Sequence, residues 1–563
     1  MTLSLSVDPD HVLEEAQTEE AAQLLHRARG EDSSSSTAYQ MSFAGRYATS
    51  PVPKYRLPED GTPVDATYQL LKNELLLDGK PGLNLASFVN TWMPDEATKL
   101  MSETIGVNLC DQDEYPATMA IHARCISILS DLWKAPRNNT KDGKRLAAMG
   151  TATTGSSEAI MLGLMAAKRR WQSKMKAAGK DIHKPGPNLV FGSNVQVAVE
   201  KFARYWEVEE RPVDIDETTR YCLSAKRAIE KVDENTIAVV VILGSTYTGT
   251  YEPVEEMAGL LDEYQKRTGV DVPIHVDAAS GGMVAPFATP GLRWSFDIPR
   301  VASINTSGHK FGMVYPGIGW IVFRSPDMVP SELVFELHYL GSVEYSFGLN
   351  FSRPAAPMLG QMFNFINLGR SGFTRTMNGN LKNARLLSRA LELSGLFTVL
   401  SDIHRPIEKV KNASHDLGDA SLYQPGLPTV AFRWTDEFLA AHKGLEQRWV
   451  QVLLRVKGWI VPNYELPPSL GSVQILRVVV RDSVTENMID ALLHDIISIT
   501  NELVKDGATM PGVRSRVEQA EGSSAANASQ SARHHHLLAK NTDAERGRPQ
   551  GHGTRGKGFS SQC

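Results

Sequence analysis

Lys310 is the residue of this sequence that is best placed to react as an amine. It follows a run from Val301 to Asn305 that is typical of a buried strand end, and then Ser307-Gly308-His309. A lysine that reacts as an amine must be neutral part of the time, and a dry or cationic setting favours that state. The serine, glycine and histidine before it are suited to binding a phosphate. Lys310 could therefore hold a phosphate-bearing group through its side-chain nitrogen.

Asp277 is the second residue with a predicted chemical role. It ends the predicted strand Pro273–Asp277, and the small residues Ala278–Gly282 that follow leave room for a close approach of the backbone. An acid against a pyridine nitrogen keeps the ring protonated, and a protonated ring is the electron sink that pyridoxal phosphate supplies. Lys310 and Asp277 in this order suggest that cofactor. Taken singly, the lysine could be a solvated surface residue and the aspartate a helix cap or turn former.

A third motif, Gly155-Ser156-Ser157-Glu158, precedes a predicted helix from Ala159 to Lys176. Hydroxyl side chains and free N–H groups at a helix start can bind an anion, because the helix dipole also favours negative charge there. Plain N-capping by serine is the alternative interpretation of the motif.

Strands and helices alternate around these motifs. We expect strands at residues 188–191, 237–243 and 272–276 and helices at 195–205 and 254–268. Strands that are apolar without alternation are typical of a parallel sheet with helices on both faces. Ligands of such sheets bind beyond the carboxyl ends of the strands. Thr246, Asp277 and Lys310 each follow a strand, so we expect all three in one crevice.

After Pro354 the pattern predicts a smaller α+β domain. We expect helices at 358–368, 381–393, 446–456 and 486–504, strands at 429–434 and 474–480, and a capping box at Ser483–Glu486. Tyr68–Leu77 is a further helix candidate near the N-terminus. The predicted parts of the chain are a flexible arm (1–45), an N-terminal segment (46–115), a large domain (116–370), a small C-terminal domain (371–510) and a disordered tail (511–563).

Composition argues against several classes of function. The chain has 563 residues and a net charge of −5 with both signs mixed, so nucleic acid is not expected as a partner. No apolar run reaches the roughly 18 residues of a membrane span, and the N-terminus lacks a signal-peptide pattern, so we expect no membrane association and a cytoplasmic location. The four cysteines form no CxxC pair, and no metal site is predicted.

The chain resembles the pyridoxal-phosphate-dependent group II decarboxylases, and within them the glutamate decarboxylases of bacteria, plants and fungi. The motifs that carry the resemblance are Thr151–Glu158, Phe202–Trp206, Thr246–Glu252, His275–Gly282, Ser307–Gly312 and Asn350–Pro354. The resemblance implies an α/β fold of the aspartate aminotransferase type, with a mixed, mostly parallel sheet in the large domain and a small C-terminal α+β domain. It also implies a lyase that converts L-glutamate to 4-aminobutyrate and CO2.

The resemblance further implies how the cofactor would be held. Lys310 would carry pyridoxal 5'-phosphate as a Schiff base, and Asp277 would pair with the ring nitrogen. The other cofactor-binding residues would be Ser156, Ser157, Gln196, Thr246, Ala279, His309 and Ser352. Of these, Ser352 is similar to a phosphate ligand that the partner subunit donates, which implies a homodimer or a larger homo-oligomer. The N-terminal segment (46–115) would pack on that partner subunit.

For the substrate, the resemblance implies one group of residues for each carboxylate. The side-chain carboxylate would meet Ser87, Phe88, Asn108 and Asp111, and Arg477 would lie near the α-carboxylate. Two carboxylates in contact cannot both stay ionised without a large penalty, so Asp111 and the substrate should share a proton. We therefore expect a preference for acidic pH.

Two features depart from the resemblance. Glu200 stands where bacterial members carry a histidine, and the tail matches neither the short histidine-bearing segment of bacteria nor the calmodulin-binding tail of plants. The tail has His534-His535-His536, but no tryptophan follows Trp459, so calmodulin is not expected as a partner, although it is not excluded.

Two other functions stay open at this point. One is decarboxylation of aspartate, cysteine sulfinate or an aromatic amino acid by the same chemistry. The other is a non-catalytic homologue that acts as a binding scaffold, and the presence of Lys310 and Asp277 argues against it.

Overall fold

The computed structural model describes residues 52–53, 56–137, 148–337, 344–407 and 416–506. The predicted arm (1–45) and the predicted tail (511–563) lie outside these residues, and so do the three histidines of the tail. The described residues fall into two units, one up to Lys80 and one from Pro81 onward. None of the helices in this part of the chain is both long and apolar enough to span a membrane.

Among the described residues up to Lys80 there is one α-helix. This helix, α3 (Val64–Glu74), continues into a short 3-10 turn at Leu75–Leu77, so the predicted helix at 68–77 is confirmed with an earlier start. Pro63 precedes the first turn and Asp65 lies within it, and both favour a helix start.

The second unit is built on a seven-stranded sheet with the order β1-β7-β6-β5-β4-β2-β3. Its strands are β1 (Gly150–Thr153), β2 (Asn188–Gly192), β3 (Glu209–Val213), β4 (Thr236–Ile242), β5 (Ile274–Asp277), β6 (Val301–Thr306) and β7 (Gly319–Phe323). All run in one direction except β7, which is antiparallel to both β1 and β6. The predicted mixed, mostly parallel sheet is confirmed.

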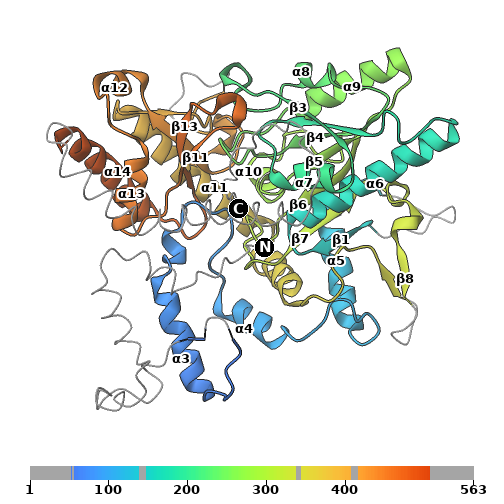
Figure 1. Cartoon of the computed structure of the whole chain (residues 1–563), viewed down its shortest axis with the longest axis horizontal. Coiled ribbons are helices and arrows are strands. Elements are labelled where there is room, and N and C mark those ends of the chain that lie inside the picture. Colours follow the sequence, from blue (N-terminus) through green and yellow to red (C-terminus); the bar gives the residue numbers. More distant parts are fainter. Residues whose placement is uncertain (1–51, 54–55, 138–147, 338–343, 408–415, 507–563) are drawn as a thin grey trace, which may run out of the picture. The chain divides into compact units, whose positions relative to one another are not determined.

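Helices cover both faces of this sheet (Figure 1). They include α5 (Pro116–Leu132), α6 (Ser156–Ala177), α7 (Val197–Tyr205), α8 (Ala225–Ile229) and α9 (Val254–Thr268). Two further helices, α4 (Asp95–Glu103) and α10 (Ala285–Ala288), pack on α11 (Ala356–Leu393). Consecutive residues of β4 show why the strand has no polar face. Val239 and Val241 pack in one core cluster with α9, and Val240 and Ile242 pack in another with α6 and α7.

The C-terminal part forms a separate antiparallel sheet with the order β10-β11-β13-β12, as the small α+β domain requires. Its strands are β10 (Phe397–Val399), β11 (Thr429–Trp434), β12 (Asn463–Glu465) and β13 (Gln474–Val479). Its helices are α11 (Ala356–Leu393), α12 (Asp436–Ala441), α13 (Arg448–Val456) and α14 (Glu486–Asp506). A two-stranded ribbon of β8 (Phe335–Leu337) and β9 (Glu344–Ser346) precedes them.

Three expectations need correction. The capping box predicted at Ser483 is wrong, because α14 begins at Glu486 and the hydroxyl of Thr485 accepts from the backbone N–H of Met488. Of the two helices predicted at 358–368 and 381–393, the second begins earlier than expected: α11 consists of two helices that meet at a kink at Gly369 (φ 55°), directly after the predicted end of the first. The segment 46–115 is divided at Lys80, because from Pro81 onward its apolar residues belong to the main core.

Candidate active site

The predicted site residues follow strands that end at one edge of the central sheet. β2, β4, β5 and β6 are parallel, and β1 has their direction because β7 is antiparallel to both of its neighbours. The connecting segments that carry Ser156, Gln196, Thr246, Ala279 and Lys310 therefore begin at the same edge (Figure 1). Strand direction alone thus brings the starts of these segments to one edge of the sheet.

Asp277, the last residue of β5, is held in a fixed orientation. Its side chain is 3% exposed, and its Oδ1 accepts hydrogen bonds from Asn305 Nδ2 (2.8 Å) and from the backbone N–H of Ala279 (3.1 Å). Oδ2 takes part in neither bond, so it is the oxygen left to face a ligand. A buried carboxylate with two N–H donors suits an acid that must stay ionised against a ring nitrogen.

Ser156, Ser307 and His309 come together at the start of α6. The hydroxyl oxygens of Ser156 and Ser307 are 2.6 Å apart. The helix is preceded by Gly155, which offers no capping side chain, so the N–H groups of the first turn remain available to an anion. Close packing requires the glycines here, since a Cβ on Gly319 would lie 2.4 Å from the carbonyl carbon of Gly155. This donor set fits a phosphate group.

His309 adds a donor of defined tautomer to this group. Its Nδ1 accepts from the backbone N–H of Ile318 (3.3 Å), so in the neutral ring the proton lies on Nε2. Burial and, to a smaller extent, the charge of Lys310 lower the pKa of His309 to about 4, which keeps the ring neutral near pH 7. The ring lies beside Gly155, with Cε1 3.1 Å from the position that a Cβ would take.

Lys310 lies between the phosphate donors and the ring of Phe88. Its Nζ is 5.4 Å from the centre of that ring, which is itself 2% exposed and packs edge-to-face on Phe311. The backbone N–H of Met313 donates to the carbonyl of Lys310 (3.0 Å) and so tightens the segment after β6. The amine is therefore carried on a fixed turn with an aromatic wall on one side.

Arg477, on β13, reaches the same place from the small domain. Its side chain is almost fully buried, its Nη1 donates to the carbonyl of Thr246 (2.7 Å), and its Nη2 donates to the carbonyl of Ala86. The guanidinium lies 4.9 Å from the ring centre of Phe88 and 5.4 Å from that of Tyr464. This arginine is a rigid cation between two aromatic rings.

Asn108, Asp111 and Ser352 form a second group. Asn108 Nδ2 donates to Asp111 Oδ1 (2.9 Å) and to Ser352 Oγ (3.4 Å), and its Oδ1 accepts from the backbone N–H of Arg353 (3.1 Å). In the described part of the chain, none of these bonds reaches Ser87 or any other member of the Lys310 group. These three residues thus form one hydrogen-bonded group.

The remaining predicted residues lie at the crevice in smaller roles. Gln196 caps α7 through its Oε1, which accepts from the backbone N–H of Ala198 (2.6 Å). Ser157 is the exposed second residue of α6, and Ser87 Oγ accepts from the N–H of Val89 (3.1 Å). Ala279 contributes its backbone, since its carbonyl accepts from the N–H of Ser307 (3.0 Å).

Two contributors were not assigned a role from the sequence. Tyr464 lines the guanidinium of Arg477, and Asn305 holds Asp277. A role for Asn305 could have been predicted from the sequence, because Ser303 and Asn305 are polar residues two apart in a buried strand and so share one face. Tyr464 had none, because its place depends on how the small sheet packs.

A cavity lies elsewhere and holds none of these residues. It measures about 500 Å³ and is lined by α5, α10 and the interruption of α11. Its walls include Ile128, Phe287 and Phe365, with few polar groups to orient a ligand. In the described residues, no group of three or more His, Cys, Asp or Glu could hold a metal ion.

Comparison with known proteins gives a consistent result. A family model described as the pyridoxal-dependent decarboxylase conserved domain matches residues 58–408. The chain is 42% identical over 514 residues to a glutamate decarboxylase of Petunia hybrida, which covers 91% of this chain and 94% of that relative. It is 44% identical over 473 residues to the glutamate decarboxylase of Saccharomyces cerevisiae, covering 80% and 79%. The solved structure of a Lactobacillus brevis glutamate decarboxylase matches with a TM-score of 0.73 at 34% identity, covering 80% of this chain and 96% of that one.

Proposed function

The chain belongs to the pyridoxal-dependent decarboxylase family, and we propose that it is a lyase that converts L-glutamate to 4-aminobutyrate and CO2 with pyridoxal 5'-phosphate as cofactor. The observation that carries the proposal is the meeting of Asp277, the Ser156–Ser307–His309 donors and Lys310 at one sheet edge. The named relatives support glutamate over the other amino acids. A non-catalytic scaffold would have no use for a buried, oriented Asp277.

The chain's own residues account for how the cofactor would be held. Ser156, Ser307 and His309 would bind its phosphate, and Asp277 Oδ2 would keep its ring nitrogen protonated. Lys310 would form the covalent link until the substrate amine replaces it. When bound, the cofactor supplies the electron sink that lets the carbon–carboxylate bond break.

Phe88 and Arg477 would orient the substrate. Arg477 is a cation held in place by two carbonyls and two rings, so it can attract the α-carboxylate without moving. The ring of Phe88 lies near both cations, with its centre 5.4 Å from Lys310 Nζ and 4.9 Å from the guanidinium of Arg477. Protonation of the carbon that loses CO2 then completes a turnover in which one proton is consumed.

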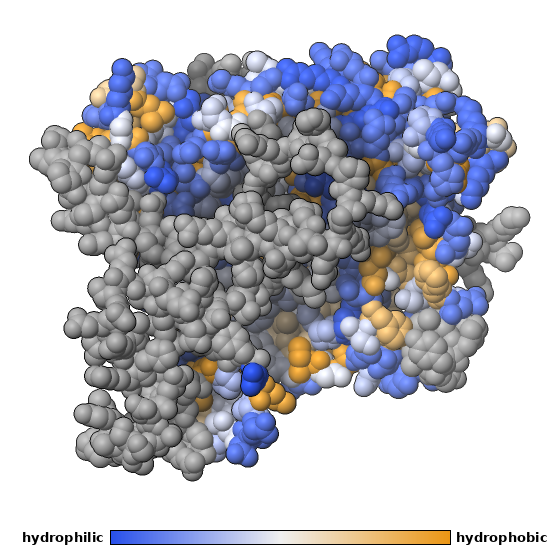
Figure 2. Space-filling model, in the orientation of Figure 1, coloured by the Kyte–Doolittle hydropathy of each residue, from blue (hydrophilic) through white to orange (hydrophobic). Residues whose placement is uncertain are grey.

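The second cluster suggests that the site is shared between subunits. Asn108 donates hydrogen bonds to both Asp111 and Ser352, so we expect the three residues to serve the same site. Exposed apolar side chains surround Ser352, including Tyr345, Leu349 and Phe351. Figure 2 shows hydrophobic residues, in orange, on the part of the surface where β8 lies in Figure 1. We infer a homodimer, or a larger homo-oligomer, in which this cluster serves the Lys310 of the partner subunit.

Mixed dimers test this sharing. One subunit carries Lys310→Ala, and the other carries Asn108→Ala with Ser352→Ala. If each site takes its cluster from the partner, a mixed dimer keeps one intact site, and random pairing of equal amounts restores about a quarter of wild-type activity. Co-expression of the two variants with separate tags, followed by glutamate assays, measures it. Activity no greater than that of the two variants measured apart would show that each subunit builds its own site.

Substrate choice should depend on Asp111 and Ser87. We expect Asp111→Asn to blunt the acid preference and to raise the share of activity near neutral pH, because no shared proton is then needed. Ser87→Ala should mainly weaken glutamate binding, since it removes one polar contact. A missing methylene alone is worth about 1–3 kcal/mol, so aspartate is rejected mainly because polar groups are left without partners.

The measurement is kcat/KM against pH for glutamate and aspartate in each variant. Asp113→Asn, an exposed acid two residues away, is the matched control and should keep the wild-type profile. An unchanged profile in Asp111→Asn, or equal use of aspartate by the wild type, would contradict this assignment of the substrate residues.

The proposed reaction itself is tested by product identification. The purified protein with added cofactor is incubated separately with glutamate, aspartate, cysteine sulfinate and an aromatic amino acid, and the amine formed is identified by mass spectrometry. We expect 4-aminobutyrate from glutamate in equal amount to CO2. A cytoplasmic location, and the lack of a calmodulin partner, stay predictions from the sequence.

A further inference from the structure

Four polar residues lie side by side in the buried centre of the sheet, between β5 and β6. In the register of these parallel strands His275 is opposite Ser303, and Asp277 is opposite Asn305. Residues two apart point to the same face, so the two pairs form two rungs of one ladder. Their neighbours Ile274, Val276, Val301 and Ile304 are all fully buried and apolar. Polar groups in such a setting need a reason to be there.

The first rung fixes the carboxylate of Asp277. Only the amide nitrogen of Asn305 can donate to a carboxylate, which determines how the amide lies. The bond from Asn305 and the bond from Ala279 both end on Oδ1. They prevent rotation of the carboxylate, so Oδ2 alone is presented to the crevice.

We propose that Asn305 is a positioning residue for the reaction, which fixes the carboxylate of Asp277 and selects the oxygen that meets the cofactor ring nitrogen. This inference rests on the proposed function, because it needs a ring nitrogen at that place. Asn305 is fully buried and so has no route to the substrate. Its effect must therefore pass through Asp277.

The second rung is formed by His275 and Ser303. His275 Nδ1 and Ser303 Oγ are 2.8 Å apart, and the ring lies against α6 so closely that a Cβ on Gly163 would be 2.7 Å from Cε1. Burial lowers the pKa of His275 to about 4, although the charge of Asp277 and a hydrogen bond with the side chain of Asn305 act in the opposite direction. The imidazole is neutral above that pH and does not neutralise Asp277. The carboxylate must then rely on Asn305 and Ala279.

Two substitutions of Asn305 distinguish positioning from mere packing. Asn305→Ala removes the donor at every pH, and a hydrogen bond to a charged group corresponds to roughly tenfold to a hundredfold in an equilibrium. We expect cofactor affinity and kcat to fall by that factor. Asn305→Asp keeps the shape, and its carboxyl group can donate to Asp277 only while it is protonated. Its cofactor affinity should approach the wild-type value near pH 5 and fall as the pH rises toward about 8.

Other titratable groups nearby are common to all variants, so each variant is compared with the wild type at the same pH. They are His275, Glu252, His309 and Lys310. Burial raises the pKa of Glu252 to about 7, with the charge of Asp277 adding to the effect. From α6, which packs on both strands, Gly163 faces His275, and the single acid of that helix, Glu158, is bonded to Thr154.

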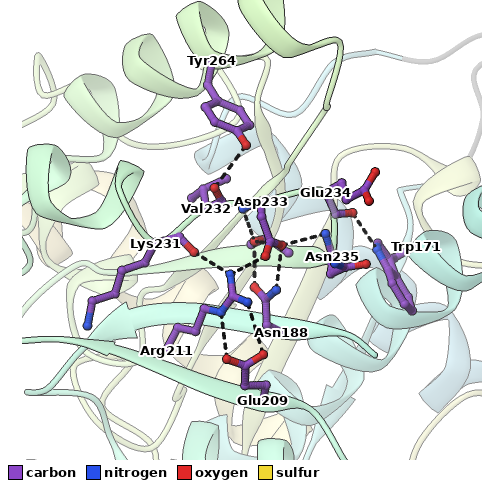
Figure 3. A network of polar contacts seen from close by, with 11 residues as sticks. Trp171, Asn188, Glu209, Arg211, Lys231, Val232, Asp233, Glu234, Asn235 and Tyr264 are labelled. Atoms are coloured by element: carbon purple, nitrogen blue, oxygen red, sulfur yellow. Dashed lines mark hydrogen bonds and ion pairs between the residues drawn. The ribbon is translucent and has the colours of Figure 1, made fainter. Parts of the chain in front are cut away.

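The control lies at the opposite edge of the same sheet. There Asn188, also fully buried, donates from Nδ2 to Asp233 Oδ1 at 2.8 Å, in the network with Arg211 shown in Figure 3. This pair resembles the first rung but lies far from the cofactor edge. Asn188→Ala should lower the unfolding temperature and leave cofactor affinity and its pH dependence unchanged.

The measured quantity is the dissociation constant of pyridoxal phosphate from each variant. It is obtained by titrating the apoprotein with pyridoxal phosphate at each pH and recording the visible absorbance. Thermal unfolding of each apoprotein checks that the variant is folded. Wild-type affinity in Asn305→Ala, a wild-type pH dependence in Asn305→Asp, or an equal loss in Asn188→Ala would overturn the inference. Because the affinity is measured without glutamate, a failure of the proposed reaction would show separately, as a wild type that binds cofactor but forms no amine.

Discussion

Replacing Lys310 by alanine is expected to abolish glutamate turnover, with a loss of at least about a thousandfold in kcat. The lysine is the only group proposed to link the cofactor to the chain, and its Nζ lies at the edge where Asp277 and the phosphate donors meet. The same variant should lose the visible absorbance that the covalent link gives. Assays of 4-aminobutyrate and an absorbance spectrum measure both effects.

Lys168→Ala is the matched control for this prediction. Lys168 lies on α6, is half-buried, and has a pKa that burial lowers, so it is chemically comparable to a reactive lysine. Its Nζ donates to the carbonyl of Trp206, away from the crevice. We expect full activity and a normal spectrum. If Lys310→Ala kept the absorbance and the turnover, the site would be misplaced.

Asp277→Asn is expected to have the second-largest effect, a loss of about a hundredfold to a thousandfold in kcat with the fold retained. Asn305 and Ala279 both donate to Oδ1, so the new amide must keep its oxygen there and turn its nitrogen toward the cofactor. An amide N–H can only donate. The ring nitrogen would then be held unprotonated, and the electron sink would be weakened.

The measurement is kcat with glutamate together with the amount of cofactor retained after dialysis. Asp233→Asn is the control, since Asp233 is a carboxylate bonded by an asparagine at the other edge of the sheet (Figure 3). Burial opposes ionisation there, but the hydrogen bonds from Asn188 and Arg211 lower the pKa of Asp233. Asp233→Asn should lower the free energy of unfolding and leave kcat with glutamate unchanged. If Asp277→Asn were as active as the wild type, the proposed role of Asp277 against the ring nitrogen would be wrong.

Much of the large sheet was predictable because its inner strands are unusual in composition. β4 is apolar from Ile237 to Ile242 and buried at every residue, which is typical of a sheet covered on both faces. β1 was not predicted, since Gly-Thr-Ala-Thr is short and half polar. It is a strand because it pairs with β7, and that pairing depends on a strand order that local sequence does not encode.

The candidate site also has features that could be predicted from the sequence and features that could not. The placing of Thr246, Asp277 and Lys310 after strands that end at one sheet edge followed from strand direction, so the sequence was sufficient for these three residues. The contact between Ser156 and Ser307, and the hydrogen bonds that join Asn108 to Asp111 and Ser352, depend on how loops pack and could not be predicted. The place of Asn305 on the same strand face as Ser303 could be predicted from the alternation of polar residues in a buried strand. That Asn305 pairs with Asp277 became evident only from the register of β5 and β6.

Reductive trapping tests the central claim most directly. Borohydride converts the covalent link between cofactor and lysine into a stable bond, and peptide mass spectrometry then locates the label. We predict a single label on Lys310 without substrate, a much weaker label when the reaction is quenched during turnover of glutamate, and an unchanged label with aspartate. A label on another lysine, or a label on Lys310 that glutamate does not diminish while 4-aminobutyrate is formed, would contradict the account.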